Sequence, residues 1–432
     1  MKILVFSVSS WNGKVGSNTW ATLLEQYDSA DIANICIRDE IPDSSVCSKY
    51  FCVSESRILK SIFNRKIKTG REISSVTQKQ AEEELIEHNQ RYSKYRKKRR
   101  YSILMLREVA WKLGKWKTKE LNDFLDDFQP DIILHSMEGY IHLNRIIEYS
   151  IKRTGAKAIG YIWDDNFTYK QSKTIGYKIY RLFQRRSLKK LAKITDDFLA
   201  ITQKTKREAD AFFGIDCTVL SKPLNSIPSA EKYENLIYPI KFLYTGNLLI
   251  GRDKTLLKIV EVLKEITAIN QKVRISVYTQ TQLNEDALSR LNCDFCNIHS
   301  AIPQQEVLEK QKEADVLLFL EDMDGKDAKT ARLSFSTKLT DYLSCGKCIF
   351  AVGNSDLAPM EYLRENGAAI VACNKEEIKS KLIPMLSNRE VLSECVEKAV
   401  CCGIKNHNPD IIPKKFNEIL TNVYELKDRR KG

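Results

Sequence analysis

The sequence predicts an α/β protein with two doubly wound domains, and three observations lead to this fold class. The chain has 432 residues, which is too long for one ordinary hydrophobic core. Short, nearly continuous apolar runs alternate with helical segments, as in parallel sheets that are buried on both faces. A stretch with little periodicity and several prolines, residues 221–240, interrupts this alternation and indicates a linker between the domains.

The first half opens with a strand, a loop and a helix. Residues 2–8 are β-branched and aromatic enough to predict a strand, and residues 19–27 predict a helix. The loop between them contains Gly13 and Gly16. Further strands are expected at residues 130–135, 158–163 and 198–202, and a helix at 143–154. We therefore assign residues 1–220 to the first domain, with a charged helical insertion at about 79–127.

The alternation restarts after the linker. Strands are expected at residues 241–245, 274–278, 315–320 and 348–352, and helices at 255–269, 305–313 and 336–344. These elements form a second domain over residues 241–410, and residues 411–432 are expected to form a helix that returns to the first domain. Ligands of doubly wound sheets bind beyond the carboxyl ends of the strands. The loops that follow the four strands of the second domain should therefore meet at one site.

The formal net charge of +13 is compatible with an anionic partner. Much of the excess lies in residues 94–100 and 178–193, and neither run is accompanied by an aromatic RNA-binding signature, a zinc finger or a helix-turn-helix. We therefore expect no nucleic acid partner. No apolar run approaches the roughly 20 residues that span a bilayer, and the opening residues are too weakly apolar for a signal peptide. These features predict a cytoplasmic protein.

The 12 cysteines include two CxxC pairs, Cys293 with Cys296 and Cys345 with Cys348. Zinc ribbons usually hold their two pairs closer together in sequence, and the second pair here brackets an expected helix-to-strand turn. Reduced, buried thiols are the preferred interpretation because cytosolic cysteines usually behave as small hydrophobic residues. The sequence predicts neither a bound metal nor a cofactor.

The most informative segment is RLSFSTKLTDYLSCGKCIFAVG, residues 332–353. A turn of small residues opens a helix at Ser336, which is followed by an acid at Asp341, a glycine and a buried strand. This segment resembles the donor-binding core of retaining glycosyltransferases with the GT-B fold, and is similar to the group 1 type that builds bacterial polysaccharides. The resemblance implies two Rossmann-like domains that face a central cleft. It also implies a nucleotide-diphosphate sugar as the donor substrate.

Within this segment, physical chemistry indicates a role for each polar group. Helix N-termini favour anions, so the N–H groups of Ser336 and Thr337 are expected to bind the donor diphosphate, and Lys338 adds a point charge. Asp341, about one turn later, is expected to accept hydrogen bonds from ribose hydroxyls. The alternative is that Ser336 only caps the helix and Asp341 is a solvated surface acid. The first acid of the family's glutamate-x7-glutamate pattern falls at Leu333.

Residues 242–257, FLYTGNLLIGRDKTLL, resemble the first strand of the family's second domain with its glycine-rich phosphate loop. Gly246 would let the backbone approach a ligand, while Arg252 and Lys254 are expected to neutralise the diphosphate leaving group. The family's arginine directly after the glycine is replaced here by Asn247, which we include among the donor-binding residues. The alternative for Arg252 is a basic residue in an ordinary surface turn.

Two acidic features follow in the second domain. Residues 354–366, which contain Glu361, resemble the helix that closes the donor site. Asp322 and Asp324 form an aspartate-x-aspartate, which holds a divalent metal in the other large glycosyltransferase fold. We prefer a solvated acidic loop because two carboxylates lack the remaining ligands of a calcium loop. Basic side chains and a helix terminus already supply the diphosphate's counter-charge.

The candidate residues of the first domain follow its expected strands. Gly13 and Gly16 resemble the glycine-bearing loop that faces the cleft in this fold. His135 and the pair Asp164 and Asp165 come at the ends of buried strands, where the sites of α/β proteins are built. We expect the two aspartates to position the acceptor or the reacting sugar. The alternative is that they cap the following helix.

The resemblance implies a retaining, metal-independent glycosyltransferase. It would move a sugar to a hydroxyl of a surface polysaccharide or a lipid-linked glycan. Two alternatives stay open, namely a nucleotide-sugar epimerase of the same fold and a catalytically silent module that binds a sugar nucleotide or a membrane. The second alternative is favoured by Leu333 and Asn247, which stand where relatives carry charges.

Residues 175–194 predict an amphipathic basic helix. Its apolar residues recur at near-helical spacing: Ile179, Leu182, Phe183, Leu188 and Leu191. One interpretation packs this stripe on the first sheet and leaves the basic face in water. The other places the helix on an anionic membrane surface, because each Lys or Arg there contributes roughly 1 kcal/mol. The protein would then be peripheral on the inner face of the membrane.

Overall fold

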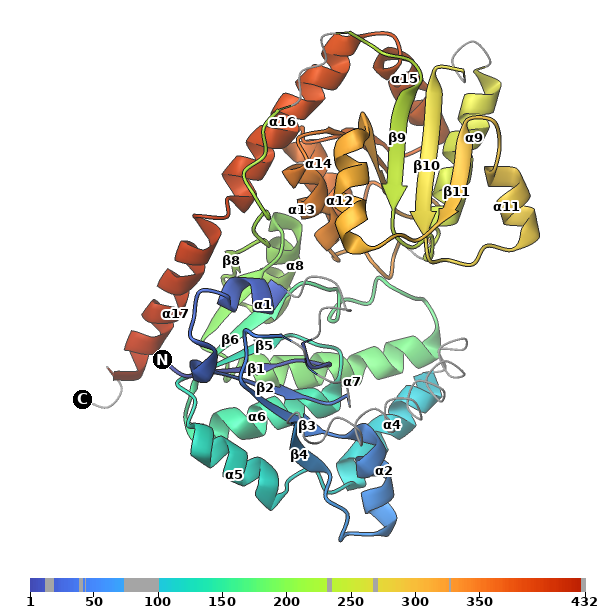
Figure 1. Cartoon of the computed structure of the whole chain (residues 1–432). Helices are drawn as coiled ribbons and strands as arrows, with labels where there is room; N and C mark the ends of the chain where they lie inside the picture. Colours follow the sequence, from blue (N-terminus) through green and yellow to red (C-terminus); the bar gives the residue numbers. More distant parts are fainter. Residues whose placement is uncertain are drawn as a thin grey trace. The chain divides into compact units, whose positions relative to one another are not determined.

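The computed structural model describes residues 1–11, 19–38, 42, 44–73, 101–230, 235–266, 271–325 and 328–428 (Figure 1). The chain forms two compact units, one of Met1–Leu220 with Pro413–Gly432 and the other of Ser221–Ile412. Gly13, Gly16, the basic run 94–100 and the first part of the expected helical insertion lie outside the described residues. Within the described ranges, no helix has the length and apolar character needed to cross a membrane.

The first unit contains an eight-stranded sheet in the order β4-β3-β2-β1-β5-β6-β7-β8. Its strands are β1 (Ile3–Phe6), β2 (Ile32–Cys36), β3 (Lys49–Val53), β4 (Gly70–Ile73), β5 (Ile132–Ser136), β6 (Lys157–Ile162), β7 (Asp197–Ala200) and β8 (Thr218–Val219). All neighbouring strands run parallel except β3 and β4. The order reverses between β1 and β5, so a doubly wound sheet places its ligand site at the carboxyl ends of these two strands.

Helices cover both faces of this sheet. They are α1 (Thr19–Leu24), the short 3-10 turn η1 (Ser29–Asp31), α2 (Glu55–Phe63), α4 (Tyr101–Leu113), α5 (Lys119–Phe128), α6 (Ile141–Thr154), α7 (Ile175–Ala192) and α8 (Gln203–Phe213). In Figure 1, α5, α6 and α7 lie together on one side of the sheet and α1 lies on the other. The C-terminal helix α17 (Ile412–Asp428) packs here too, since Phe416 contacts Trp20 and Tyr27 hydrogen-bonds Asn417 at 2.7 Å.

The second unit contains a six-stranded sheet in the order β11-β10-β9-β12-β13-β14, and all neighbouring strands are parallel. The strands are β9 (Ile240–Thr245), β10 (Val273–Thr279), β11 (Cys296–Ser300), β12 (Val316–Leu320), β13 (Cys348–Val352) and β14 (Ile370–Ala372). The helices are α9 (Arg252–Glu265), α11 (Glu285–Leu291), α12 (Gln304–Glu313), α13 (Thr337–Ser344), α14 (Ala358–Glu365), α15 (Lys375–Met385) and α16 (Arg389–His407). The strand order reverses between β9 and β12.

The central strands of the second sheet are buried on both faces, which explains their nearly continuous apolar sequences. Phe242 and Leu318 belong to a buried cluster that includes residues of α9 and α15. Their neighbours Leu243 and Leu317 belong to a cluster on the opposite face with residues of α13 and α14. The predicted fold class, two parallel-rich α/β sheets with helices, is confirmed.

The start of the expected linker is part of the second unit. Leu224 is buried in the cluster that contains α13, and its N–H donates to the His407 carbonyl at 2.8 Å. The His407 ring in turn hydrogen-bonds the Lys222 carbonyl at 2.8 Å. The absence of periodicity in residues 221–225 thus reflects an extended segment that packs through its backbone, and not a free connection.

Candidate functional site

The candidate site lies where the strand order of the second sheet reverses. Gly246 and Asn247 follow β9, and Glu321 follows β12, so the two loops leave the same edge of the sheet. Helix α13 begins beside them, because the Lys338 ammonium lies next to the Gly246 backbone. Carboxyl ends of strands at a reversal of strand order are the usual ligand position in doubly wound sheets. Sequence reasoning had placed Gly246, Asn247 and Lys338 at one site, and the structure brings them together.

Gly246 is required at its position for two reasons. Its φ angle is +132°, a backbone conformation that residues with side chains rarely adopt. A Cβ atom at this position would lie 2.3 Å from the Lys338 nitrogen. The absence of a side chain therefore lets the lysine reach the carboxyl edge of β9.

Lys338 presents a positive charge that lacks a counter-ion. Its ammonium lies 4.2 Å from the centre of the Tyr244 ring, and the Tyr244 hydroxyl donates to the Asn247 carbonyl at 2.5 Å. Among the described residues, Lys338 has no ion-pair partner. Burial, and secondly the charge of Arg252, lower the pKa of Lys338 to about 7. An anion bound here would favour the charged form of the lysine.

Arg252 is already paired, in contrast to Lys338. One of its terminal nitrogens lies 3.0 and 3.1 Å from the two carboxylate oxygens of Glu321. Its Nε donates to the Leu320 carbonyl at 3.1 Å, and its other terminal nitrogen donates to the Asn247 side chain at 2.9 Å. The guanidinium thus holds the loops after β9 and β12 together. These contacts distinguish Arg252 from a basic residue in an ordinary surface turn.

The N-terminus of α13 adds unsatisfied donors to this edge. Ser336 occupies the N-cap position, but its side chain makes no capping hydrogen bond. Thr337 is exposed, and Lys338 follows it in the first turn. The first N–H groups of a helix have no partner within the helix and attract anions. The helix start, Lys338 and Gly246 together form an arrangement suited to a phosphate group.

Asp341 lies one turn further along α13 and is half-buried. Its Oδ1 lies 3.7 Å from the Lys222 ammonium and 3.5 Å from the Asn225 side-chain nitrogen. Asp341 is therefore not an isolated surface acid. Of the remaining expected donor residues, Lys254 is exposed in the first turn of α9, and Glu361 is half-buried in the first turn of α14.

The aspartate-x-aspartate pair serves the loop that follows β12. Asp322 is buried, not solvated, because its carboxylate accepts the N–H groups of Asp324 and Ala328, each at 3.0 Å. Asp324 pairs with Lys258 at 2.6 Å. Across the residues that the structure describes, no three His, Cys, Asp or Glu side chains gather closely enough to hold a metal ion.

Two candidate residues of the first unit, His135 and Asp165, are buried. His135 lies inside β5, is fully buried and hydrogen-bonds Thr195 at 3.1 Å, and burial lowers its pKa to about 4. Asp165 is also buried, and it accepts the Thr168 N–H at 2.9 Å, which closes a turn. Asp165 therefore stabilises a turn and does not cap the following helix, because α7 begins only at Ile175 with Thr174 at its N-cap. The burial of His135 does not support contact with an acceptor.

Glu138 was missed by sequence reasoning. It follows β5 at the reversal of strand order in the first sheet, and it is half-buried. The Ser136 hydroxyl donates to its carboxyl group at 3.0 Å. Burial, and secondly the nearby carboxylate of Asp164, raise the pKa of Glu138 to about 7. Two interacting carboxyl groups at this position are a candidate acid–base pair.

Comparisons with known proteins agree with this architecture. No protein-family model matches the sequence, and no curated protein sequence matches it. Among solved structures, a trehalose 6-phosphate synthase from Burkholderia multivorans has a TM-score of 0.60 at 10% identity, over 100% of this chain and 98% of that one. The Anabaena protein HepE, in complex with UDP, has a TM-score of 0.62 at 10% identity, over 98% of this chain and 100% of that one.

A third structure is the lipopolysaccharide outer core galactosyltransferase WaaB in its apo form. It has a TM-score of 0.58 at 13% identity, over 98% of this chain and 99% of that one. These three neighbours have two Rossmann-like domains. This chain has the GT-B fold. At these identities, the likeness shows the fold alone.

Two residues of the candidate site in the second unit were not expected from the sequence. Glu321 precedes the aspartate-x-aspartate of Asp322 and Asp324 and matches no motif of its own. Lys222 was assigned to the linker, although its side chain is buried near Asp341. The signal in the sequence for Glu321 was its position directly after an apolar strand, since ligands of doubly wound sheets bind beyond the carboxyl ends of the strands.

We expect Glu138→Gln to stabilise the GT-B protein at alkaline pH. Because the folded-state pKa of Glu138 is raised from 4.5 to about 7, the folded protein loses stability as pH rises through this interval. The amide removes this loss, so the free energy of unfolding at about pH 8 should rise by on the order of 2 kcal/mol. Near pH 4.5 the difference should disappear. Urea unfolding at both pH values measures it.

The matched control for this experiment is Glu25→Gln, which changes an exposed carboxylate of the first unit. It should alter stability little at either pH, because substitutions of exposed side chains usually change the free energy of unfolding only slightly. A Glu138→Gln effect of the same size at both pH values would show that Glu138 titrates normally.

Proposed function

We propose that this protein is a glycosyltransferase that moves a sugar from a nucleotide-diphosphate sugar to an acceptor hydroxyl. The observation that carries the proposal is Lys338, a partly desolvated lysine that forms no salt bridge with the described residues and lies at the reversal of strand order in the second unit. The start of α13 and the backbone of Gly246 adjoin it. A diphosphate is the anion that suits this combination of lysine charge, helix N-terminus and glycine-lined approach.

The structural neighbours support a nucleotide sugar as the donor. Structures of HepE, which has the same fold, contain UDP, UDP with glucose, or UDP-glucose. In the proposed reaction, the bond between the anomeric carbon and the diphosphate oxygen breaks, and the nucleoside diphosphate leaves with the electron pair. A bond forms between that carbon and the acceptor oxygen, which gives up its proton. Lys338 and the helix start stabilise the charge that develops on the leaving group.

The finer roles are part of the same proposal. Asp341 holds ribose hydroxyls, and Arg252, fixed by Glu321, keeps a second positive charge beside Lys338. Asp164 of the first unit acts on the acceptor side together with Glu138. We further propose that the reaction needs no metal and retains the anomeric configuration, which the resemblance of residues 332–353 to retaining relatives supports.

For the acceptor, we propose a surface polysaccharide or a lipid-linked glycan. WaaB, which shares the fold, is described as a lipopolysaccharide outer core galactosyltransferase. Helix α7 supports a lipid-linked acceptor because it exposes apolar and basic side chains together. The protein would then work on the cytoplasmic face of the membrane.

A panel of nucleotide sugars tests the function. We expect one of them to raise the unfolding temperature of the full chain, because ligand that binds only the native state stabilises it by mass action. That sugar nucleotide should be hydrolysed slowly without an acceptor, and Asp341→Ala should weaken its binding by about 10- to 100-fold. Isomerisation of the donor would instead identify an epimerase, and tight binding without turnover would identify a catalytically silent module.

A further inference from the structure

Helix α4 exposes several apolar side chains and buries a glutamate. Glu108 and Trp111 are buried, whereas Leu106 is 68% exposed, and Val109 and Leu113 are exposed as well. A helix that covers a sheet normally has the opposite arrangement, with its apolar stripe toward the core. Exposed apolar groups on one helix face indicate a surface that meets another partner when they continue onto neighbouring elements.

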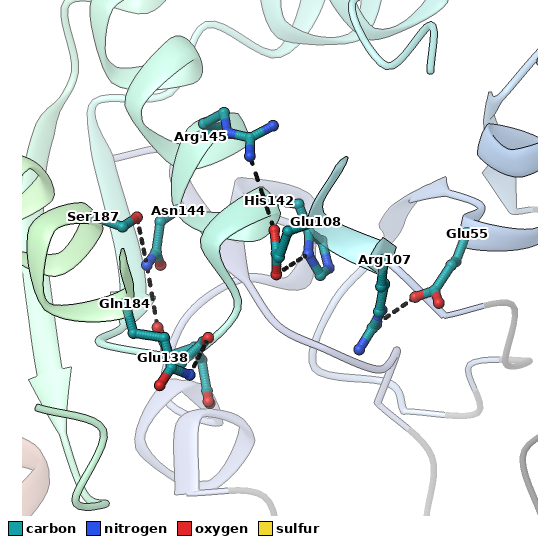
Figure 2. Close-up of polar contacts among 10 residues, drawn as sticks. Glu55, Arg107, Glu108, Glu138, His142, Asn144, Arg145, Gln184 and Ser187 are labelled. Carbon is teal, nitrogen blue, oxygen red and sulfur yellow. Dashed lines mark hydrogen bonds and ion pairs between the residues drawn. The ribbon is translucent and has the colours of Figure 1, made fainter. Parts of the chain in front are cut away.

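Buried polar contacts hold α4 in this orientation (Figure 2). Glu108 lies with its Oε1 2.9 Å from Nδ1 of His142 on α6. The adjacent Arg107 pairs with Glu55 of α2. Turning α4 to bury Leu106 would break both contacts and leave buried charges without partners, which is costly. The apolar stripe is therefore held toward solvent by the fold itself.

The two helices that pack against α4, namely α2 and α7, also expose apolar side chains. Phe63 at the end of α2 is 93% exposed, and Ile175 at the start of α7 is 77% exposed. The intervals between the exposed residues of α7 place them on one helix face. We call the exposed apolar set the three-helix surface, and it consists of Leu59, Phe63, Ile103, Leu106, Val109, Leu113, Ile175, Ile179, Leu182 and Phe183.

This finding corrects one expectation for residues 175–194. The stripe Ile179, Leu182 and Phe183 was expected either to pack on the first sheet or to meet a membrane. The structure exposes these three residues and buries only Leu188 and Leu191 of the predicted set. The side chains that face the core in the first half of α7 are instead polar or aromatic: Tyr177, Tyr180, Arg181 and Gln184.

Positive charge accompanies the three-helix surface. Helix α7 contains no acidic residue, and α4 contains only the buried Glu108. The exposed cations of the three helices are Lys60, Lys112, Lys178, Arg186, Lys189 and Lys190, and Lys193 follows α7 directly. In the sequence, the basic run KYRKKRR of residues 94–100 also ends immediately before α4 begins. An anionic partner with an apolar interior complements this combination of groups.

We propose that the three-helix surface docks the protein on an anionic lipid membrane, with its apolar side chains at the acyl boundary and its cations among the headgroups. This inference extends the membrane part of the proposed function from α7 to α2 and α4. A second copy of the chain fits less well, because a two-fold contact would bring like charges together. A lipid surface instead neutralises them.

Some cations of α7 already contact other side chains of the protein, whereas others are available to contact lipid. Arg185 lies over the Phe212 ring at 4.2 Å, and Lys190 pairs with Glu148 at 2.8 Å. Lys178, Arg186 and Lys193 form no ion pair with a described residue and are exposed. These three residues are therefore the ones to change in a test of the electrostatic contribution.

The experiment is co-sedimentation of the full chain with vesicles of phosphatidylcholine, alone or mixed with phosphatidylglycerol. We expect sedimentation only with the anionic vesicles, and release by added salt. Lys178→Gln with Arg186→Gln and Lys193→Gln should lower the partition coefficient about a hundredfold, since each cation contributes about fivefold. Phe63→Gln with Leu106→Gln and Ile179→Gln should lower it at least about tenfold.

Matched variants of the second unit control for charge and hydrophobicity. Lys379→Gln with Lys381→Gln and Lys405→Gln removes the same charge elsewhere, and Ile237→Gln with Leu288→Gln and Ile411→Gln removes exposed apolar groups elsewhere. Both controls should sediment nearly as the native protein does. Thermal unfolding of every variant checks that the fold is retained, which we expect because the changed side chains are exposed.

Several results would overturn the inference. They are equal sedimentation with both vesicle types, an equal loss in the control variants, or binding that survives the loss of the apolar groups. Self-association that Leu106→Gln abolishes would identify the surface as a contact between copies. UDP binding is measured separately, by calorimetry without lipid, so that a failure of the proposed function can be distinguished from a failure of the membrane proposal. Vesicle binding without binding of UDP or of any nucleotide sugar of the panel would overturn the proposed function alone, and nucleotide binding without vesicle binding would overturn only the membrane surface.

Discussion

Replacing Lys338 with methionine should weaken the binding of UDP to the full chain by about 10- to 100-fold, the effect of losing a charge-assisted hydrogen bond. Methionine retains an unbranched side chain of similar length, so the contact with Tyr244 is preserved while the charge is lost. The reason for the large effect is that Arg252 is already paired with Glu321. Isothermal titration calorimetry near neutral pH measures it.

The same lysine gives UDP binding a characteristic pH dependence. The pKa of Lys338 is lowered to about 7 in the free protein, and a bound anion favours the protonated lysine. Affinity should therefore fall as pH rises from about 7 to about 9, by at most about tenfold per pH unit. The phosphate of the ligand ionises near pH 6 and does not interfere. Affinity that is independent of pH in this interval would argue against a lysine–diphosphate contact.

The control for both measurements is Lys254→Met. Lys254 is exposed in the first turn of α9 and makes no polar contact with the described residues. Although the sequence predicts that Lys254 helps to neutralise the diphosphate, the structure places it in an exposed position. Its loss should therefore weaken UDP binding only slightly and leave the pH dependence unchanged. If Lys254→Met and Lys338→Met have equal effects, the anion site is not centred on α13.

Removing the carboxylate of Glu321 should destabilise the protein strongly and leave UDP binding intact. Its side chain is 7% exposed and pairs with Arg252 through both oxygens. Glu321→Ala leaves a largely buried guanidinium without its partner, which costs about 3–5 kcal/mol of the free energy of unfolding. Urea unfolding at neutral pH measures this loss.

Two further variants serve as comparisons for the loss of stability in Glu321→Ala. Glu321→Gln keeps an acceptor for Arg252 and should cost less than Glu321→Ala. Glu313→Ala breaks an exposed pair with Lys310 and should leave the free energy of unfolding nearly unchanged. UDP affinity of Glu321→Ala should stay unchanged or increase, because the local charge becomes more positive. Loss of UDP affinity in a folded Glu321→Ala protein would show that the pair with Arg252 is needed to shape the site.

Much of the second unit could be predicted from the sequence. The run Cys348–Val352 is a strand with the expected bounds, because continuous apolar residues between polar turns can be buried only in the middle of a parallel sheet. Gly246 and Asn247 were assigned to the candidate site because residues 242–257 resemble a strand followed by a glycine-rich phosphate loop, and the structure places both residues directly after β9. The first unit was less predictable, because short strands such as β3 and β4 have mixed sequences with no clear period.

The sequence by itself determined the two doubly wound halves and the place of Gly246, Ser336 and Lys338 at the end of a strand and the start of a helix. These features depend on local periodicity, glycine and helix-start chemistry, which act over a few residues. Only the tertiary structure decided that Glu321 forms an ion pair with Arg252 and that Lys338 forms none with a described residue. Ion pairs between residues distant in sequence depend on strand order, which no local pattern contains. For the same reason, only the packing of α4 against α2 and α6 decided which side of that helix meets solvent.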